Sequence, residues 1–206
     1  MILRLFMGVW LLGLGSLFTL GSARAAEPQT ATIERFHAAL IDNMKNGKAL
    51  GFEGRRAKLE PIIKETFDIP TMARISTGAA AWTKLSDADK AAITDGFAKW
   101  TTASYAGNFS AFDGESFVTK SQTPDDGKGN VLVNTQLTPN GMAPVAFNYR
   151  MQKTGEIWKV VDIFLDGAIS QLATFRAQFA TVLGKGTPAD LVAHMNKLAA
   201  DANKGS

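Results

Sequence analysis

The spacing of apolar residues changes along this 206-residue chain, and that change constrains the fold more than any other feature. Up to about Asn108, apolar side chains recur every three or four residues, as they do on one face of a helix. After Asn108 they recur every second residue, as in strands, and turn residues interrupt them at short intervals. From Ile169 onward the helical spacing returns. The pattern predicts helices, then an antiparallel meander, then helices, which is an α+β fold.

Several helix boundaries are marked by residues that favour helix ends. Asp68, Ser86 and Thr187 are each placed to cap the N-terminus of a helix, and Gly78 suits a helix end. Pro61 fits a helix only in its first turn or at a kink. About six helices are predicted, at residues 31–45, 59–67, 69–77, 87–105, 169–179 and 188–198.

Four strands are predicted, with the sequences "ESFVTKSQT", "VLVNTQL", "APVAFNYRMQ" and "EIWKVVDIFL". In the last strand, Val161, Ile163 and Leu165 are expected to point to one face of the sheet. Trp158, Val160 and Phe164 are expected to point to the other. Because both rows are apolar, both faces of this strand must be covered. We expect a curved sheet of about four strands, packed with the helices in a single domain. The concave side of such a sheet suits a hydrophobic cavity, although the same periodicity fits a filled core.

The N-terminal segment predicts export. Arg4 precedes the apolar run "LFMGVWLLGLGSLFTL", and small residues follow at Ala23 and Ala25. This arrangement is typical of a cleavable signal peptide, which we place at residues 1–25, with one domain at residues 26–206. An uncleaved membrane anchor is the alternative, but the run is short for a bilayer span.

Composition and charge argue against several classes of function. The chain has no cysteine, so disulfides, thiolate metal sites and a cysteine nucleophile are excluded. The net charge is +3, and no basic stripe of the kind that binds nucleic acid is visible. The two histidines, His37 and His194, lie on apolar helix stripes without a neighbouring ligand or carboxylate. We interpret them as packing residues rather than metal ligands or general bases.

Motifs that suggest chemistry have structural explanations as well. The stretch "GKGTPA" at residues 184–189 matches a nucleotide-binding pattern, but it follows a predicted helix instead of a strand. Asp162 and Asp166 lie four residues apart, ~13 Å along a strand, which is too far for a glycosidase pair. Asp166 and Gly167 are better explained as the turn and cap of the next helix. We therefore predict no catalytic residue, metal or cofactor.

Two segments carry a family resemblance. The stretches "FEGRRAKLEPIIKETFDIPTMARISTGAAAWTKLS" and "WKVVDIFLDGAISQLATFRAQF" resemble the MlaC/toluene-tolerance family of periplasmic lipid-binding proteins, and the similarity extends over about residues 31–202. The chain is most similar to the hopanoid-associated branch, HpnM. The resemblance implies a sheet and helices around a hydrophobic cavity for acyl chains, with the headgroup near the mouth. It also implies a periplasmic carrier without catalysis, which exchanges phospholipid or hopanoid-type lipid with membrane lipid-transport complexes.

The resemblance, together with the predicted faces, gives a set of candidate cavity residues. They are Met72, Ile75, Phe97, Trp100, Tyr105, Val133, Phe147, Tyr149, Val161, Ile163 and Leu172. Arg74 is the candidate for a phosphate headgroup, and a salt bridge at the surface is its alternative role. For every apolar candidate, ordinary core packing is the alternative.

Three hypotheses about function remain at this point. The first is a periplasmic lipid carrier, which acts as a monomer and needs an apolar cavity. The second is an adaptor subunit of a membrane lipid transporter, with a filled core and no ligand. The third is an exported enzyme on a similar scaffold, which requires a cluster of titratable groups inside a pocket.

Overall fold

The computed structural model describes residues 27–205, and the predicted signal peptide at residues 1–25 lies outside this range. The helices are α1 (Pro28–Lys45), α2 (Gly47–Thr66), α3 (Ile69–Thr77), α4 (Ala79–Trp82), α5 (Asp87–Asn108), α6 (Gln171–Leu183) and α7 (Pro188–Asp201), followed by a 3₁₀ turn at Ala202–Gly205. The strands are β1 (Ser116–Asp125), β2 (Asn130–Thr138), β3 (Val145–Thr154), β4 (Ile157–Leu165) and β5 (Ile169–Ser170). The predicted α+β fold is confirmed. Among the helices of this described range, none is long and apolar enough to cross a membrane.

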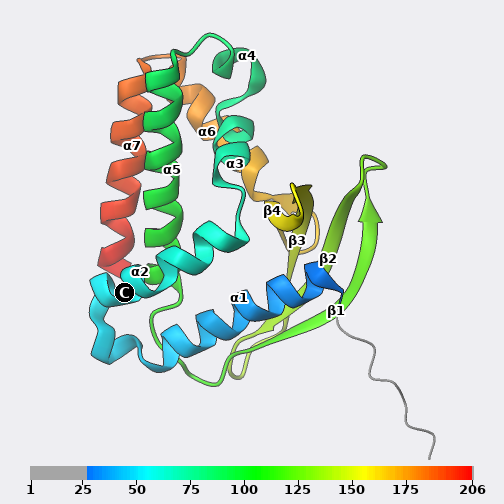
Figure 1. Ribbon diagram of the computed structural model, residues 1–206. Coiled ribbons are helices and arrows are strands. Elements are labelled where there is room, and N and C mark those ends of the chain that lie inside the picture. The colour runs from blue at the N-terminus through cyan, green and yellow to red at the C-terminus, as the bar shows by residue number, and fades with distance from the viewer. Residues whose placement is uncertain (1–26, 206) are drawn as a thin grey trace, which may run out of the picture.

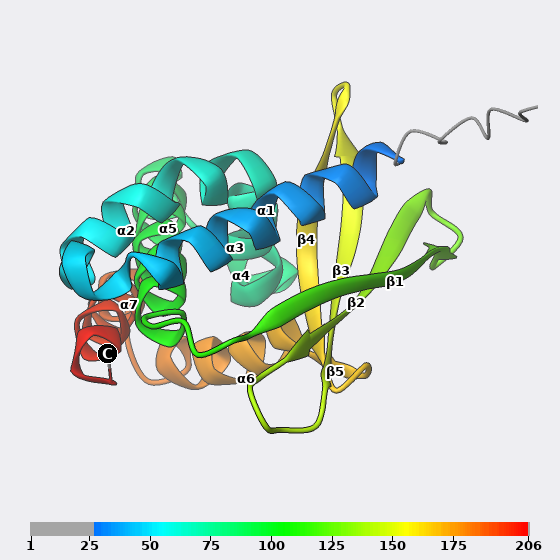
Figure 2. The ribbon, with the colours of Figure 1, turned by 90° about the horizontal axis from the view of Figure 1, so that it is seen from below.

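The strands form one antiparallel sheet in the order β1-β2-β3-β4-β5. The predicted meander of four strands is therefore extended by a fifth, which pairs only Ile169 and Ser170 with the end of β4. Figure 2 shows α1 lying across the sheet, with α6 beside the end where β5 is found. The remaining helices form a second body beside the sheet, in which α5 and α7 lie side by side (Figure 1).

The close packing of α5 depends on glycine. A Cβ atom at Gly107 would lie 2.4 Å from the carbonyl oxygen of Ala202, which is closer than atoms can approach. A similar addition at Gly96 would lie 3.0 Å from the Cε atom of Met195. These glycines let the last helix and the 3₁₀ turn approach the α5 backbone.

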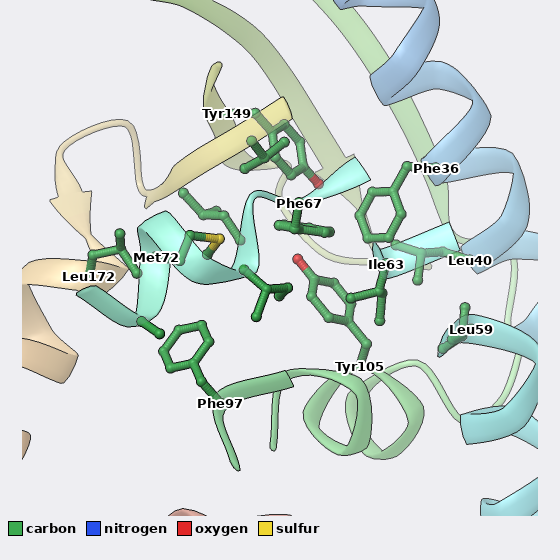
Figure 3. Close-up of a cluster of buried hydrophobic side chains, with 14 of the residues drawn as sticks. Phe36, Leu40, Leu59, Ile63, Phe67, Met72, Phe97, Tyr105, Tyr149 and Leu172 are labelled. Atoms are coloured by element: carbon green, nitrogen blue, oxygen red, sulfur yellow. The ribbon is translucent and has the colours of Figure 1, made fainter. Parts of the chain in front are cut away.

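The core lies where the helices meet the sheet. Phe36 of α1 makes edge-to-face contacts with Phe67 and Tyr105, at 5.1 and 5.2 Å between ring centroids. It makes a third such contact with Tyr149 of β3, at 6.3 Å. Figure 3 shows these four rings pointing toward one another from four different parts of the chain. Because such pairs stabilise beyond the area they bury, this cluster joins the helices to the sheet.

The predicted helix caps are confirmed by hydrogen bonds. The side chain of Asp68 accepts from the backbone N–H of Thr71, and that of Ser86 accepts from the N–H of Asp89. Gly78 ends α3 with a φ of 86°, a conformation that glycine adopts without strain. At α7, the Thr187 side chain and the third helical residue cap each other reciprocally, which is a capping box.

Two local predictions were wrong. Pro61 lies neither in a first turn nor at the kink: α2 is broken at Gly51, and Pro61 lies well inside the helical segment that follows. The buried neighbours Leu59 and Ile63 pack into the core and hold this segment helical. The other wrong prediction concerns Asp166, which makes the turn after β4 with a φ of 50° but does not cap α6.

The cap of α6 comes instead from Ser170 and Asp162. Ser170 accepts from the N–H of Ala173 and donates its hydroxyl to Asp162, at 2.6 Å. Asp162 also accepts from the N–H of Leu172, at 3.2 Å. A buried carboxylate in β4 thus satisfies the first turn of the helix that follows it, and this fixes α6 against the sheet.

Candidate functional site

A cavity of about 360 Å³ lies between the sheet and helices α3, α5 and α6. Its lining comes from six elements and one loop residue: Met72, Phe97, Trp100, Thr101, Ser104, Tyr105, Asn108, Phe109, Leu137, Phe147, Ile163, Leu165, Gln171 and Phe175. None of these residues carries a charge. An apolar pocket with a few polar groups is the general form of a site for an apolar ligand.

Helix α5 supplies most of one wall. Phe97 is followed at three, four, seven and eleven residues by Trp100, Thr101, Ser104 and Asn108, which places them along one face of the helix. Phe97 is fully buried, whereas Asn108, at the end of the helix, is exposed. The lining therefore extends from the core to the surface at the C-terminal end of α5.

Aromatic contacts hold the walls in place. Trp100 of α5 meets Phe175 of α6 edge to face, with ring centroids 4.6 Å apart. Phe97 contacts Trp100 in the same manner at 5.6 Å. Further along α5, Tyr105 stacks on Phe109 at 5.6 Å. Most of these rings have contacts on several sides, so the wall is well defined without a ligand.

The structure brings six of the predicted cavity residues together and separates the rest. The six that line the cavity are Met72, Phe97, Trp100, Tyr105, Phe147 and Ile163. Val133 and Tyr149 are fully buried in the core instead. Ile75, Val161 and Leu172 border a different, smaller pocket.

The position of Val161 has a specific cause. Opposite Arg150 and Met151 the register of β4 shifts, because Arg150 pairs with Asp162 while Met151 pairs with Val160. This β-bulge inserts Val161 as an extra residue and interrupts the alternation. Val160, and not Val161, therefore lies on the same face as Ile163. The predicted row of Val161, Ile163 and Leu165 is wrong at Val161.

Arg74 is not part of the cavity. It is exposed and borders the smaller pocket, of about 240 Å³, together with Arg150 and Asp162. Arg150 and Asp162 belong to the sheet face opposite the one that carries Tyr149 and Ile163. The structure therefore separates Arg74 from the cavity that the other candidates line.

Other lining residues were missed by the sequence prediction. Leu137, Leu165, Phe109 and Phe175 were missed among the apolar residues, and Thr101, Ser104, Asn108 and Gln171 among the polar ones. Thr101, Ser104 and Asn108 lie at helical spacing from Phe97, so this spacing could have assigned them to the same face. Gln171 directly follows β5, and no pattern in the sequence predicted that strand.

His37 is packed against the sheet, which agrees with its interpretation as a packing residue. Its Nε2 atom is 2.9 Å from the Tyr149 hydroxyl, and its ring stacks on Phe117 with centroids 4.0 Å apart. Burial lowers the pKa of His37 from 6.5 to about 3, because the charged imidazolium would lose its hydration. Burial also raises the pKa of the Tyr149 and Tyr105 hydroxyls. All three side chains are therefore neutral at pH 7.

The comparisons with known proteins agree with this geometry. The model of the MlaC protein family matches residues 34–197. A solved structure, described as the phospholipid-binding protein from Ralstonia solanacearum in complex with a phospholipid, is 25% identical in sequence. It covers 86% of this chain and 99% of its own, with a TM-score of 0.73. A search of curated proteins gave no match. Because the family model spans most of the described residues, this chain belongs to the MlaC family.

Proposed function

We propose that the protein is a periplasmic lipid carrier, which holds lipid tails in the cavity and shuttles them between inner- and outer-membrane complexes. The observation that supports the proposal most strongly is the cavity of about 360 Å³, whose lining is largely apolar and carries no charge. A filled core, which the adaptor hypothesis requires, would leave no such space. A cluster of titratable groups, which an enzyme would need, is not part of the lining.

Membership of the MlaC family and the phospholipid-bound relative support lipid as the ligand. The cargo that we propose is phospholipid or a hopanoid-type lipid, and the two segments described above favour the hopanoid-associated HpnM branch. The partners that we propose for such a carrier are membrane lipid-transport complexes, and the carrier itself acts as a monomer. The apolar N-terminal run supports export to the periplasm.

The cavity is large enough to hold a tail without a covalent bond. Its volume corresponds to about a dozen groups the size of a water molecule, at ~30 Å³ each. If each group is a methylene worth ~0.8 kcal/mol on burial, the gross gain is on the order of 10 kcal/mol. The loss of translational and conformational freedom reduces this gain, so the bound lipid exchanges.

A blocking substitution tests the proposal. Ser104→Trp places an indole ring on the cavity face of α5, and Lys99→Trp places the same ring on its exposed face. Transfer of a fluorescent phospholipid from donor to acceptor vesicles is measured for the mature protein and both variants. We expect transfer by the wild type and by Lys99→Trp, and a loss of at least tenfold in Ser104→Trp. Equal transfer by both variants, with both folded by circular dichroism, would exclude this cavity as the carrier site.

A further inference from the structure

The cavity wall that α5 provides has a polar row within an otherwise apolar surface. Thr101, Ser104 and Asn108 are spaced by three and four residues, and Gln171 of α6 lines the same cavity. Thr101 and Ser104 are half-buried, whereas Asn108 is exposed. The row therefore begins inside the cavity and ends at the surface.

The row is available to a ligand. Among the hydrogen bonds of residues 27–205, none involves the side chain of Thr101, Ser104 or Asn108. In contrast, the neighbouring Thr94 and Thr102 bond back to backbone carbonyls four residues earlier in the helix. Polar side chains that face an apolar cavity without a protein partner offer both donors and acceptors to a bound molecule.

The lining offers nothing to balance a charge. It contains no lysine, arginine or histidine, and Arg74 borders the separate pocket. A buried carboxylate or phosphate without a counter-charge is costly, whereas a hydroxyl, ester or amide needs only hydrogen bonds.

From these observations we infer that the cavity prefers a lipid whose alkyl chain is joined to an uncharged hydrogen-bonding group, which the polar row of Thr101, Ser104 and Asn108 binds. The inference rests on the proposed function, because it specifies the lipid class for the same cavity. A monoacyl lipid with an ester and free hydroxyls fits this description, and an ionised fatty acid of equal chain length does not.

Two probes and one variant test the inference. The probes are a monoacylglycerol and the free fatty acid of the same chain length, and each competes at pH 8 with a fluorescent alkyl reporter bound to the mature protein. The variant combines Thr101→Val, Ser104→Ala and Asn108→Leu, which removes the polar groups with little change in volume. We expect the monoacylglycerol to bind at least tenfold more tightly than the fatty acid. We expect the variant to lose most of this preference while its affinity for the alkyl reporter is unchanged.

The outcomes separate this inference from the proposed function. Equal affinity for both probes, or a preference that survives in the variant, would overturn the polar-row inference and leave the carrier function standing. Failure of the wild type to bind the alkyl reporter or either probe would instead contradict the carrier function itself. Tighter binding of the fatty acid would show that a cation outside the lining takes part, and this too would overturn the inference.

Discussion

The buried histidine in α1 gives a prediction about stability that can be worked out in numbers. His37 packs against Phe117, and its Nε2 atom lies 2.9 Å from the Tyr149 hydroxyl. Its pKa falls from 6.5 to about 3 in the folded protein, because burial disfavours the imidazolium. The folded state therefore keeps His37 neutral over a pH range in which the unfolded chain protonates it.

The sign and size of the effect follow from proton linkage. Between pH 6.5 and about 3 the unfolded state binds one more proton at this site, so acidification favours unfolding. The stability is fully present above pH 6.5 and is lost as the pH falls toward 3. At pH 5 the loss is about 2 kcal/mol, since each pH unit below 6.5 costs ~1.4 kcal/mol. Asp42 on the same helix, whose pKa Lys58 lowers, contributes only at lower pH.

Urea denaturation at pH 7 and pH 5 measures this loss. His37→Gln removes the titrating ring but keeps an amide that can bond to Tyr149. We expect the wild type to lose about 2 kcal/mol more than His37→Gln between the two pH values. The control His194→Gln keeps the full acid sensitivity, because His37 is still present. If His37→Gln and the wild type lose equal stability, the argument from burial is refuted.

Two further substitutions test the packing and the capping described above. Gly107→Ala should lower the free energy of unfolding by about 1–3 kcal/mol, because the new Cβ would lie 2.4 Å from the Ala202 carbonyl oxygen; an unchanged urea midpoint would contradict this. Asp162→Ala should cost about 1–3 kcal/mol by removing the acceptor for the Leu172 N–H and the Ser170 hydroxyl. Asp162→Asn, which keeps one acceptor oxygen, should lose less, and equal losses in the two variants would argue against the cap.

The features that the sequence predicted well are local. Asp68, Ser86 and Thr187 cap helices because each side chain reaches an N–H only three residues further along the chain. The strands of the meander were predicted for a related reason, since adjacent strands joined by short turns need no distant information. The α+β class follows from the two periodicities alone.

The features that were missed depend on contacts between distant segments. A single extra residue at Val161 reverses the side-chain alternation, and no residue type in β4 signals such a bulge. Arg74 and Leu172 lie within the two segments that carry the family resemblance, yet α3 and α6 present them to the other pocket. Pro61 is tolerated inside α2 because tertiary packing outweighs helix propensity.

Whether a residue lines a cavity or fills a core was equally beyond the sequence. Phe147 and Tyr149 lie on the same face of β3, two residues apart. Phe147 borders the cavity, whereas Tyr149 is covered completely by α1 and its neighbours. Periodicity assigns both residues to one face and cannot separate them, because the difference is set by the helices packed opposite.

The most direct test of the central claim is native mass spectrometry of the mature protein purified from a bacterial periplasm, followed by extraction and identification of what was bound. The account predicts a stoichiometric lipid, retained by the wild type and lost from Ser104→Trp. Protein that is consistently empty, and that takes up no lipid from vesicles, would contradict the carrier function and favour the adaptor role.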